Sequence, residues 1–254
     1  MSLETTKQLL THLKLNTAAK EIDEVLARQR KSVPLDWLEQ LLAREWDARR
    51  ERAIEKRITA AEFPEITTLE GFDWTFNPDI DEARIKRLAE LDFLDEKRIA
   101  LFLGKPGTGK THLALAIGIK AAKAGHRVCC TSVKRLGQAI THAKQHGRLD
   151  RLFTKMLSAR LWILDDWGVV SMTRDVAEEV FDLLDRRKHS AAMILTSNRD
   201  VCEWGQVFPE PVLASAAIDR LFDRAEILLF AGESYRLKGR IVTRDLDERG
   251  MVRQ

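Results

Sequence analysis

The chain has 254 residues, of which 44% are hydrophobic and 32% are charged, and its formal net charge is +3. This composition indicates a folded protein of one large domain, or of one domain with a small appendage, and excludes a disordered chain. No apolar run approaches the ~20 residues that span a bilayer, and the N-terminus lacks a signal-peptide pattern. The three cysteines have neither disulfide nor zinc spacing. We therefore expect a cytoplasmic protein with reduced thiols and no membrane partner.

The first part of the chain is predicted to be helical throughout. Apolar residues recur at three-to-four-residue spacing in residues 16–30 and again in 34–46, as they do on one face of a helix. An Arg- and Glu-rich stretch, residues 47–62, would extend the second helix over an exposed surface. We assign residues 1–66 to a small helical domain for contact with a partner or DNA, with a merely solvated helix as the alternative.

The stretch "EFPEITTLEGFDWTFNPDID", residues 62–81, interrupts the helical pattern with two prolines and a glycine, which marks a linker. Phe72, Trp74 and Phe76 alternate within it, which predicts a short extended strip. Beyond the linker, apolar runs such as 98–104, 161–166 and 192–198 alternate with helical stretches. This alternation is typical of a parallel α/β sheet with helices on both faces, and we assign it to a second domain, residues 67–254.

The segment "GKPGTGKT", residues 104–111, follows an apolar strand and opens a helix. It matches the phosphate-binding pattern GxxxxGK[ST], in which glycines let backbone N–H groups turn toward phosphate oxygens at a helix N-terminus. Lys110 is expected to reach the β- and γ-phosphates, and the Thr111 hydroxyl to ligate Mg²⁺. We therefore predict a nucleoside triphosphate site formed by Gly104, Lys105, Pro106, Gly107, Thr108, Gly109, Lys110, Thr111 and His112.

Two acidic residues end the strand "LWILDDWG", residues 161–168. Asp165 is expected beside the Mg²⁺, which would relieve the repulsion between the two carboxylates, and Asp166 is expected to orient or deprotonate the attacking water. The alternative is a pair of helix N-cap residues. Asn198 ends a further strand, where it would bond the γ-phosphate or the lytic water, or belong to an ordinary turn.

Two arginines, Arg220 and Arg224, stand four residues apart in "AAIDRLFDRAEILLF". An arginine supplied to a neighbouring subunit's nucleotide would stabilise charge that develops in phosphoryl transfer. Salt bridges to Asp219, Asp223 or Glu226 are the alternative that the sequence alone favours. Arg236, in "ESYR", is a weaker candidate.

Positive charge is concentrated in residues 131–160, which carry seven basic residues and one acidic residue. The segment is therefore +6 and the rest of the chain −3, which indicates a local anionic partner. Because no base-reading pattern is present, we expect contact with the DNA backbone and little sequence specificity. The candidate DNA contacts are Ser132, Lys134, Arg135, Lys144, Arg148, Arg151 and Lys155.

Taken together, these segments resemble the IstB/DnaC-like branch of the AAA+ ATPases, and most closely the IstB transposition helpers. The resemblance extends from "LKLNTAAKEIDEVLARQ" through "GFDWTFNPDID", "GKPGTGKTHLALAIG", "LWILDDWG", "ILTSN" and "AAIDRLFDRA" to "ESYRLKGR". It implies that the nucleotide is ATP, that Phe72 and Phe76 lie near the adenine, and that Asn198 is the sensor-1 residue. It also implies that Arg224 is the arginine finger, with Arg220 as second choice.

The resemblance further implies a biological role. Members of this family assemble as helices or rings on duplex DNA with ATP and assist a DDE transposase encoded beside them, and the extra helical segment before "LWILDDWG" lines the DNA channel. Two departures stand out: too few residues follow "EILLF" for a full helical lid, and Asp166 stands where Glu is commoner. The shorter carboxylate implies either slow hydrolysis or compensation by the main chain. The alternatives are a replicative-helicase loader, a nucleotide-gated scaffold with little hydrolysis and, less favoured, a small-molecule kinase.

Overall fold

The computed structural model describes residues 3–28, 34–188 and 190–238, and the chain divides into two compact units, Met1–Lys56 and Arg57–Gln254. The division falls inside helix α3 (Asp36–Ala61), before the boundary predicted between residues 66 and 67. The end of α3 belongs to the second unit because Ile58 and Ala61 pack in its core and the Arg57 guanidinium donates to the Ala122 carbonyl (2.8 Å). Prolines and a glycine mark the linker in the sequence, but the packing of the end of α3 on the second unit determines where the two units divide.

The first unit consists of α1 (Leu3–His12), α2 (Asn16–Ala27) and the start of α3, so the predicted helices are confirmed. Its small core is formed by Leu10, Leu13 and Leu42. The Thr6 hydroxyl donates to the buried Glu39 carboxylate (3.0 Å). Burial of apolar surface between α1, α2 and the first part of α3 accounts for this fold.

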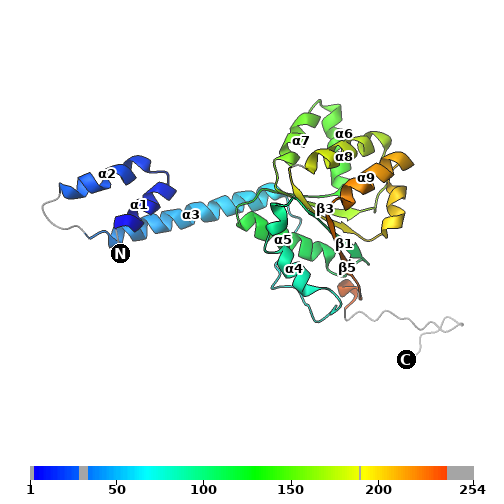
Figure 1. The fold of residues 1–254 in the computed structure, drawn as a ribbon, viewed down its shortest axis with the longest axis horizontal. Helices are drawn as coiled ribbons and strands as arrows, with labels where there is room; N and C mark the ends of the chain where they lie inside the picture. The colour runs from blue at the N-terminus through cyan, green and yellow to red at the C-terminus, as the bar shows by residue number, and fades with distance from the viewer. Residues whose placement is uncertain (1–2, 29–33, 189, 239–254) are drawn as a thin grey trace. The chain divides into compact units, whose positions relative to one another are not determined.

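The second unit is built on a parallel sheet flanked by helices (Figure 1). The sheet has five strands in the order β2-β3-β4-β1-β5. The strands are β1 (Ile99–Gly104), β2 (Val128–Ser132), β3 (Leu161–Trp167), β4 (Ala192–Ser197) and β5 (Ala225–Phe230). The central strands β1 and β4 are almost fully buried, as expected for a sheet covered on both faces. The predicted α/β fold class is therefore confirmed.

Two hydrophobic cores lie on opposite faces of this sheet. Helices α6 (Val133–Gln145), α7 (Leu149–Leu157), α8 (Arg174–Arg187) and α9 (Pro211–Phe222) contribute to one core, and α4 (Glu82–Leu88) and α5 (Lys110–Lys123) to the other (Figure 1). Short 3₁₀ helices cover Asp92–Leu94, Val201–Val207 and Tyr235–Leu237. Between β5 and residue 238 only the last of these occurs, so the described chain has no helical lid.

The linker aromatics do not form the predicted extended strip. Residues 64–81 turn repeatedly: the Phe72 N–H donates to the Leu69 carbonyl, the Phe76 N–H to the Asp73 carbonyl, and the Asp73 carboxylate accepts from Thr75. Aromatic residues at every second position thus lie in an Asx turn here and not in a strand. The prediction of an extended strip was therefore wrong.

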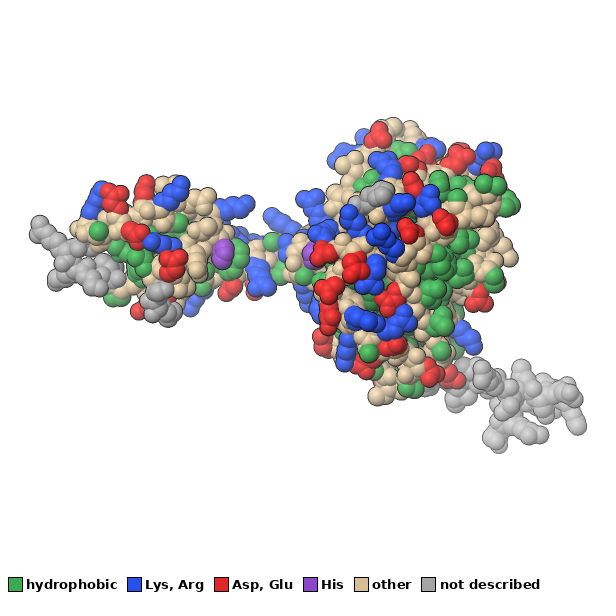
Figure 2. All heavy atoms as spheres, in the orientation of Figure 1, with side chains coloured by type: hydrophobic (Ala, Val, Ile, Leu, Met, Phe, Trp, Pro, Cys, Tyr) green, Lys and Arg blue, Asp and Glu red, His purple; other side chains and the backbone are tan. Residues whose placement is uncertain are grey.

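Charged side chains of both signs cover much of the face in Figure 2, beside an area where hydrophobic side chains gather. Over the described ranges of the chain, none of the helices combines the length and apolar character that crossing a bilayer requires.

Candidate nucleotide site

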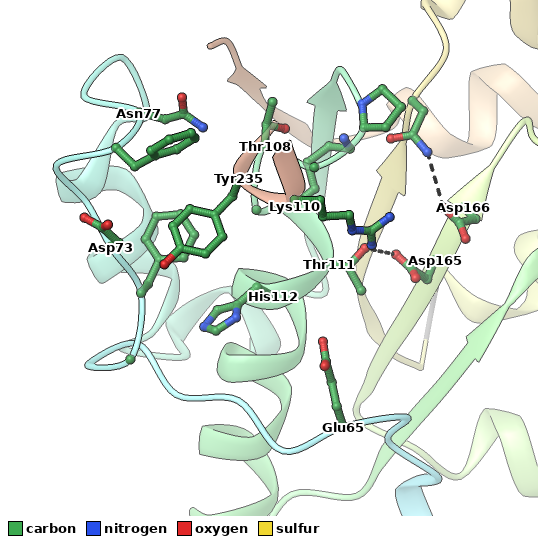
Figure 3. Close-up of a pocket in the computed structure, with 18 residues that line it drawn as sticks. Glu65, Asp73, Asn77, Thr108, Lys110, Thr111, His112, Asp165, Asp166 and Tyr235 are labelled. Carbon is green, nitrogen blue, oxygen red and sulfur yellow. Dashed lines mark hydrogen bonds between the residues drawn. The ribbon is translucent and has the colours of Figure 1, made fainter. Parts of the chain in front are cut away.

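The carboxyl ends of β1, β3 and β4 meet at one edge of the sheet, and each carries a predicted site segment. Gly104 ends β1, Asp165 and Asp166 lie near the end of β3, and Asn198 follows β4. Because parallel strands place their carboxyl ends together, residues far apart in the sequence converge here. Asp165, Asp166 and Asn198, with the loop that follows Gly104, line a cavity of about 380 Å³ (Figure 3).

The phosphate loop connects β1 to the N-terminus of α5. Gly107 and Gly109 have φ angles of 80° and 103°, which side chains rarely adopt. A Cβ atom would come within 2.0 Å of the Ser234 hydroxyl at Gly107 and within 2.5 Å of the Phe72 ring at Gly109. Both glycines are therefore required by backbone conformation and by close approach.

Lys110 is 4% exposed, and its ammonium donates to the Gly104 and Lys105 carbonyls (2.7 Å each). Burial lowers its pKa to about 8, against the opposing charges of Asp165 and Asp166. The loop from Pro106 to His112 lines the cavity, whereas Gly104 and Lys105 contribute these carbonyls from outside its lining. The predicted phosphate-binding residues Pro106 to His112 therefore line one cavity, and the Lys110 side chain is among them.

The acidic pair lies across the cavity from the linker (Figure 3). The Thr111 hydroxyl donates to Asp165 Oδ1 (2.8 Å), so the two predicted metal ligands are in contact. Hydroxyl and carboxylate oxygens are the donors that Mg²⁺ prefers, and this pair fits that ion. The alternative of an N-cap pair is wrong, because the next helix, α8, begins at Arg174 with Thr173 as its N-cap.

Asp166 has the environment expected of a group that handles a proton. Burial, and then the charge of Asp165, raise the pKa of its carboxyl group, while Lys110, Arg236 and Asn198 oppose the shift. Asn198 Nδ2 donates to Asp166 Oδ1 at 3.4 Å. The predicted catalytic residues Asp166 and Asn198 therefore lie together on one wall of the cavity, and their roles stay predictions.

The opposite wall combines the linker with the end of the described chain. Lining residues here are Gly71, Phe72, Asp73, Phe76, Asn77, Tyr235 and Arg236. The Asn77 side-chain amide donates to the Glu233 carbonyl and accepts from the Glu233 N–H (3.1 Å each). The Tyr235 N–H donates to the Gly107 carbonyl (2.9 Å), and its ring packs edge-on against Phe76. We call residues 71–77 and 232–238 the clasp.

Asn77 and Tyr235 escaped the sequence analysis. Each belongs to a short segment without a binding pattern, and 156 residues separate Asn77 from Glu233. The aromatic spacing in "FDWTF" and the isolated "ESYR" were the available signals. Phe72 and Phe76 do line the cavity, and Arg236, a weak candidate from sequence, lies within it.

The two candidate arginines lie outside the cavity of their own chain. Arg220 pairs with Asp185 (2.6 Å) and with Asp219 (2.9 Å), so the salt-bridge alternative holds for Arg220. Arg224 begins the β5 region with a φ of 57° and lines a separate open cavity of about 750 Å³ beside Arg87, Arg98 and Glu226. The structure brings neither arginine to the phosphate loop of the same chain.

The predicted DNA contacts lie on α6, α7 and the segments that flank them, with Gly147 between the two helices. Ser132 caps α6 by accepting from the Arg135 N–H (3.3 Å). Lys144 pairs with Glu179 (2.9 Å) and Lys155 with Glu62 (2.7 Å). The exposed residues Lys134, Arg135, Arg148 and Arg151 complete the set.

Comparison with known proteins agrees with this geometry. The family model described as IstB-like ATP binding protein matches residues 6–243. A Pseudomonas aeruginosa protein, named as an ATP-binding protein of insertion sequence IS21, is 42% identical over 233 residues, covering 91% of this chain and 88% of its own. A similarly named IS5376 protein of Geobacillus stearothermophilus is 36% identical and covers 80% of this chain and 81% of its own.

Solved structures resemble the fold of the second unit. The AMPPCP-bound DnaA of Aquifex aeolicus has a TM-score of 0.57 at 22% identity, covering 70% of this chain and 54% of that one. A crystal structure of DnaI has a TM-score of 0.54 at 24% identity, and the match covers 65% of this chain and 91% of DnaI. Sheet order, phosphate loop and acidic strand define an AAA+ P-loop protein. Within that class, the chain belongs to the family of IstB-like ATP-binding proteins.

Proposed function

We propose that this chain is a Mg²⁺-dependent ATPase of the cytoplasm that assembles on duplex DNA and assists the transposase of its insertion sequence. The observation that carries the proposal is one cavity wall next to a buried phosphate-loop lysine. On this wall, hydrogen bonds join Thr111 to Asp165 and Asn198 to Asp166. A site for nucleotide binding alone would not need the second carboxylate or its amide partner.

Each residue of the site has a separate role in the proposed hydrolysis. Lys110 and the loop N–H groups bind the β- and γ-phosphates at the N-terminus of α5. Thr111 and Asp165 would hold Mg²⁺, which supplies charge neutralisation of the phosphates when bound. Asp166, on the cavity wall beside the metal-side carboxylate, orients the attacking water and takes its proton. Asn198 fixes the Asp166 carboxylate.

Duplex DNA is the expected anionic partner of α6 and α7. Lys144 and Lys155 are paired with carboxylates of their own chain, so Lys134, Arg135, Arg148 and Arg151 are the principal contacts in this proposal. Backbone contacts by such side chains carry no sequence information, and affinity should fall steeply with salt.

The names of the relatives support the transposition role, since both place an ATP-binding protein within an insertion sequence. An assembly of several copies is supported by Arg224, which lines a separate cavity and not the nucleotide cavity of its own chain, so in this proposal it serves the nucleotide of a neighbouring copy. The cognate DDE transposase is the protein partner of this proposal.

Phosphate release by the full chain, with Mg²⁺ and with or without duplex DNA, tests the proposal. DNA should stimulate turnover, and Asp166→Asn should lower it by ~100-fold or more with ATP binding retained. Lys134→Ala with Arg135→Ala should weaken binding to every duplex and reduce the salt slope by about 2. Lys120→Ala with Lys123→Ala, on α5, is the matched control. If DNA-bound wild type releases no more phosphate than Asp166→Asn, ATP orders a scaffold and the enzyme role is wrong.

A further inference from the structure

The two consecutive aspartates lie in a β-bulge. Leu164 on β3 pairs with Leu195 on β4, whereas Trp167 pairs with Ser197, so the register shifts between these pairs. Asp165 and Asp166 together stand opposite one residue, Thr196. A bulge of this kind inserts an extra residue into one strand and leaves that residue without its ladder hydrogen bond.

The bulge changes where the carboxylates point. In a regular strand, consecutive side chains point to opposite faces of the sheet. Here Asp166 adopts a left-handed conformation (φ 58°), and both carboxylates line the same cavity. Left-handed backbone is unfavourable for a residue other than glycine and persists where its surroundings hold it.

Thr196 supplies the hydrogen bonds that hold this conformation. Its hydroxyl accepts from the Asp166 N–H (3.1 Å), which replaces the missing ladder bond, and donates to Asp165 Oδ1 (2.5 Å). The side chain is 1% exposed and lies outside the cavity lining. Donor and acceptor roles at one atom require a hydroxyl group, and valine has the shape of threonine without it.

We propose that Thr196 is the positioning residue of the Asp165–Asp166 pair: it fixes the metal-side carboxylate directly and the water-side carboxylate through the backbone. The inference rests on the proposed ATPase function. It also explains how the aspartate at position 166, one methylene shorter than glutamate, is aimed at the phosphate side, because the bulge rotates its backbone toward the cavity.

Thr196→Val, Thr196→Ser and the matched control Thr131→Val on β2 test the proposal in the full chain. We expect Thr196→Val to lower kcat by ~10- to 100-fold, because misplacing a reacting group by about 1 Å costs that much. The Mg²⁺ concentration that half-saturates ATP binding should rise several-fold, while ATP binding in EDTA stays unchanged. Thr196→Ser should restore both quantities to within about threefold, and Thr131→Val should leave them unchanged.

Turnover and Mg²⁺ dependence like those of wild type in Thr196→Val would overturn the proposal, as would equal losses in the Val and Ser variants. Should Thr196→Val lose its cooperative thermal transition, Thr196→Ala removes the same hydroxyl, and the same two measurements on that variant decide the question. If wild type itself fails to hydrolyse ATP, the ATPase proposal fails. The Mg²⁺ dependence of ATP binding then still decides the role of Thr196 at Asp165.

Discussion

The two walls of the nucleotide cavity are built in opposite ways. The phosphate wall uses a continuous loop, Pro106 to His112, whose contacts are fixed by glycines and a helix N-terminus. The clasp wall joins two segments far apart in sequence through Asn77, Tyr235 and their backbone partners. A continuous wall is encoded locally, and a composite wall exists only after the chain has folded. The first should therefore decide whether ATP binds, and the second how tightly.

Removing the phosphate-wall cation should give the largest effect. Lys110→Ala deletes the buried ammonium that donates to Gly104 and Lys105, so ATP affinity should fall by ~100-fold or more, as expected for loss of a charge-assisted contact to phosphate. Binding of a fluorescent ATP analogue measures it. A loss below about fivefold would mean that the phosphates bind elsewhere.

Opening the clasp should have a smaller effect. Asn77→Ala removes both hydrogen bonds to Glu233 and frees the segment that closes on Gly107, so we expect ATP affinity to fall by ~10-fold, with the phosphate loop intact. Asp79→Ala, an exposed change in the same linker, is the control. Equal affinity of the two variants in the same titration would show that the clasp does not contribute to binding.

The pH dependence of ATP binding should show the smallest effect, through titration of Lys110 in the phosphate wall. Its pKa of about 8, lowered by burial, means that the ammonium is charged below pH 8 and loses its proton above it. ATP favours the charged form, so affinity should be about tenfold weaker at pH 9 than at pH 7, with a proton taken up on binding at pH 9. Calorimetry in two buffers of different ionisation enthalpy measures this uptake. Flat affinity across the range would contradict it.

The same contrast explains what the sequence could predict. "GKPGTGKT" and "LWILDDWG" specify their local structure through glycines, strand burial and a helix start, so a strand–loop–helix and an acidic strand end could be predicted from them. The bulge opposite Thr196 depends on the pairing of two strands, and the bond of Asn77 to Glu233 depends on the whole fold. Neither leaves a local pattern. The prediction of an extended strip in the linker was wrong because alternating aromatic residues also fit an Asx turn, which is what forms at Asp73.

The clasp also sets the smallest useful length of the ATP-binding unit. A shortened chain that stops at Phe230 would keep all five strands, and by its secondary structure alone it would pass as complete. It would lack Tyr235 and Arg236, which line the cavity, and the Gly107 carbonyl would lose the hydrogen bond that the Tyr235 N–H donates to it. Expression and crystallisation trials on this unit should therefore retain residues 57–238 at least.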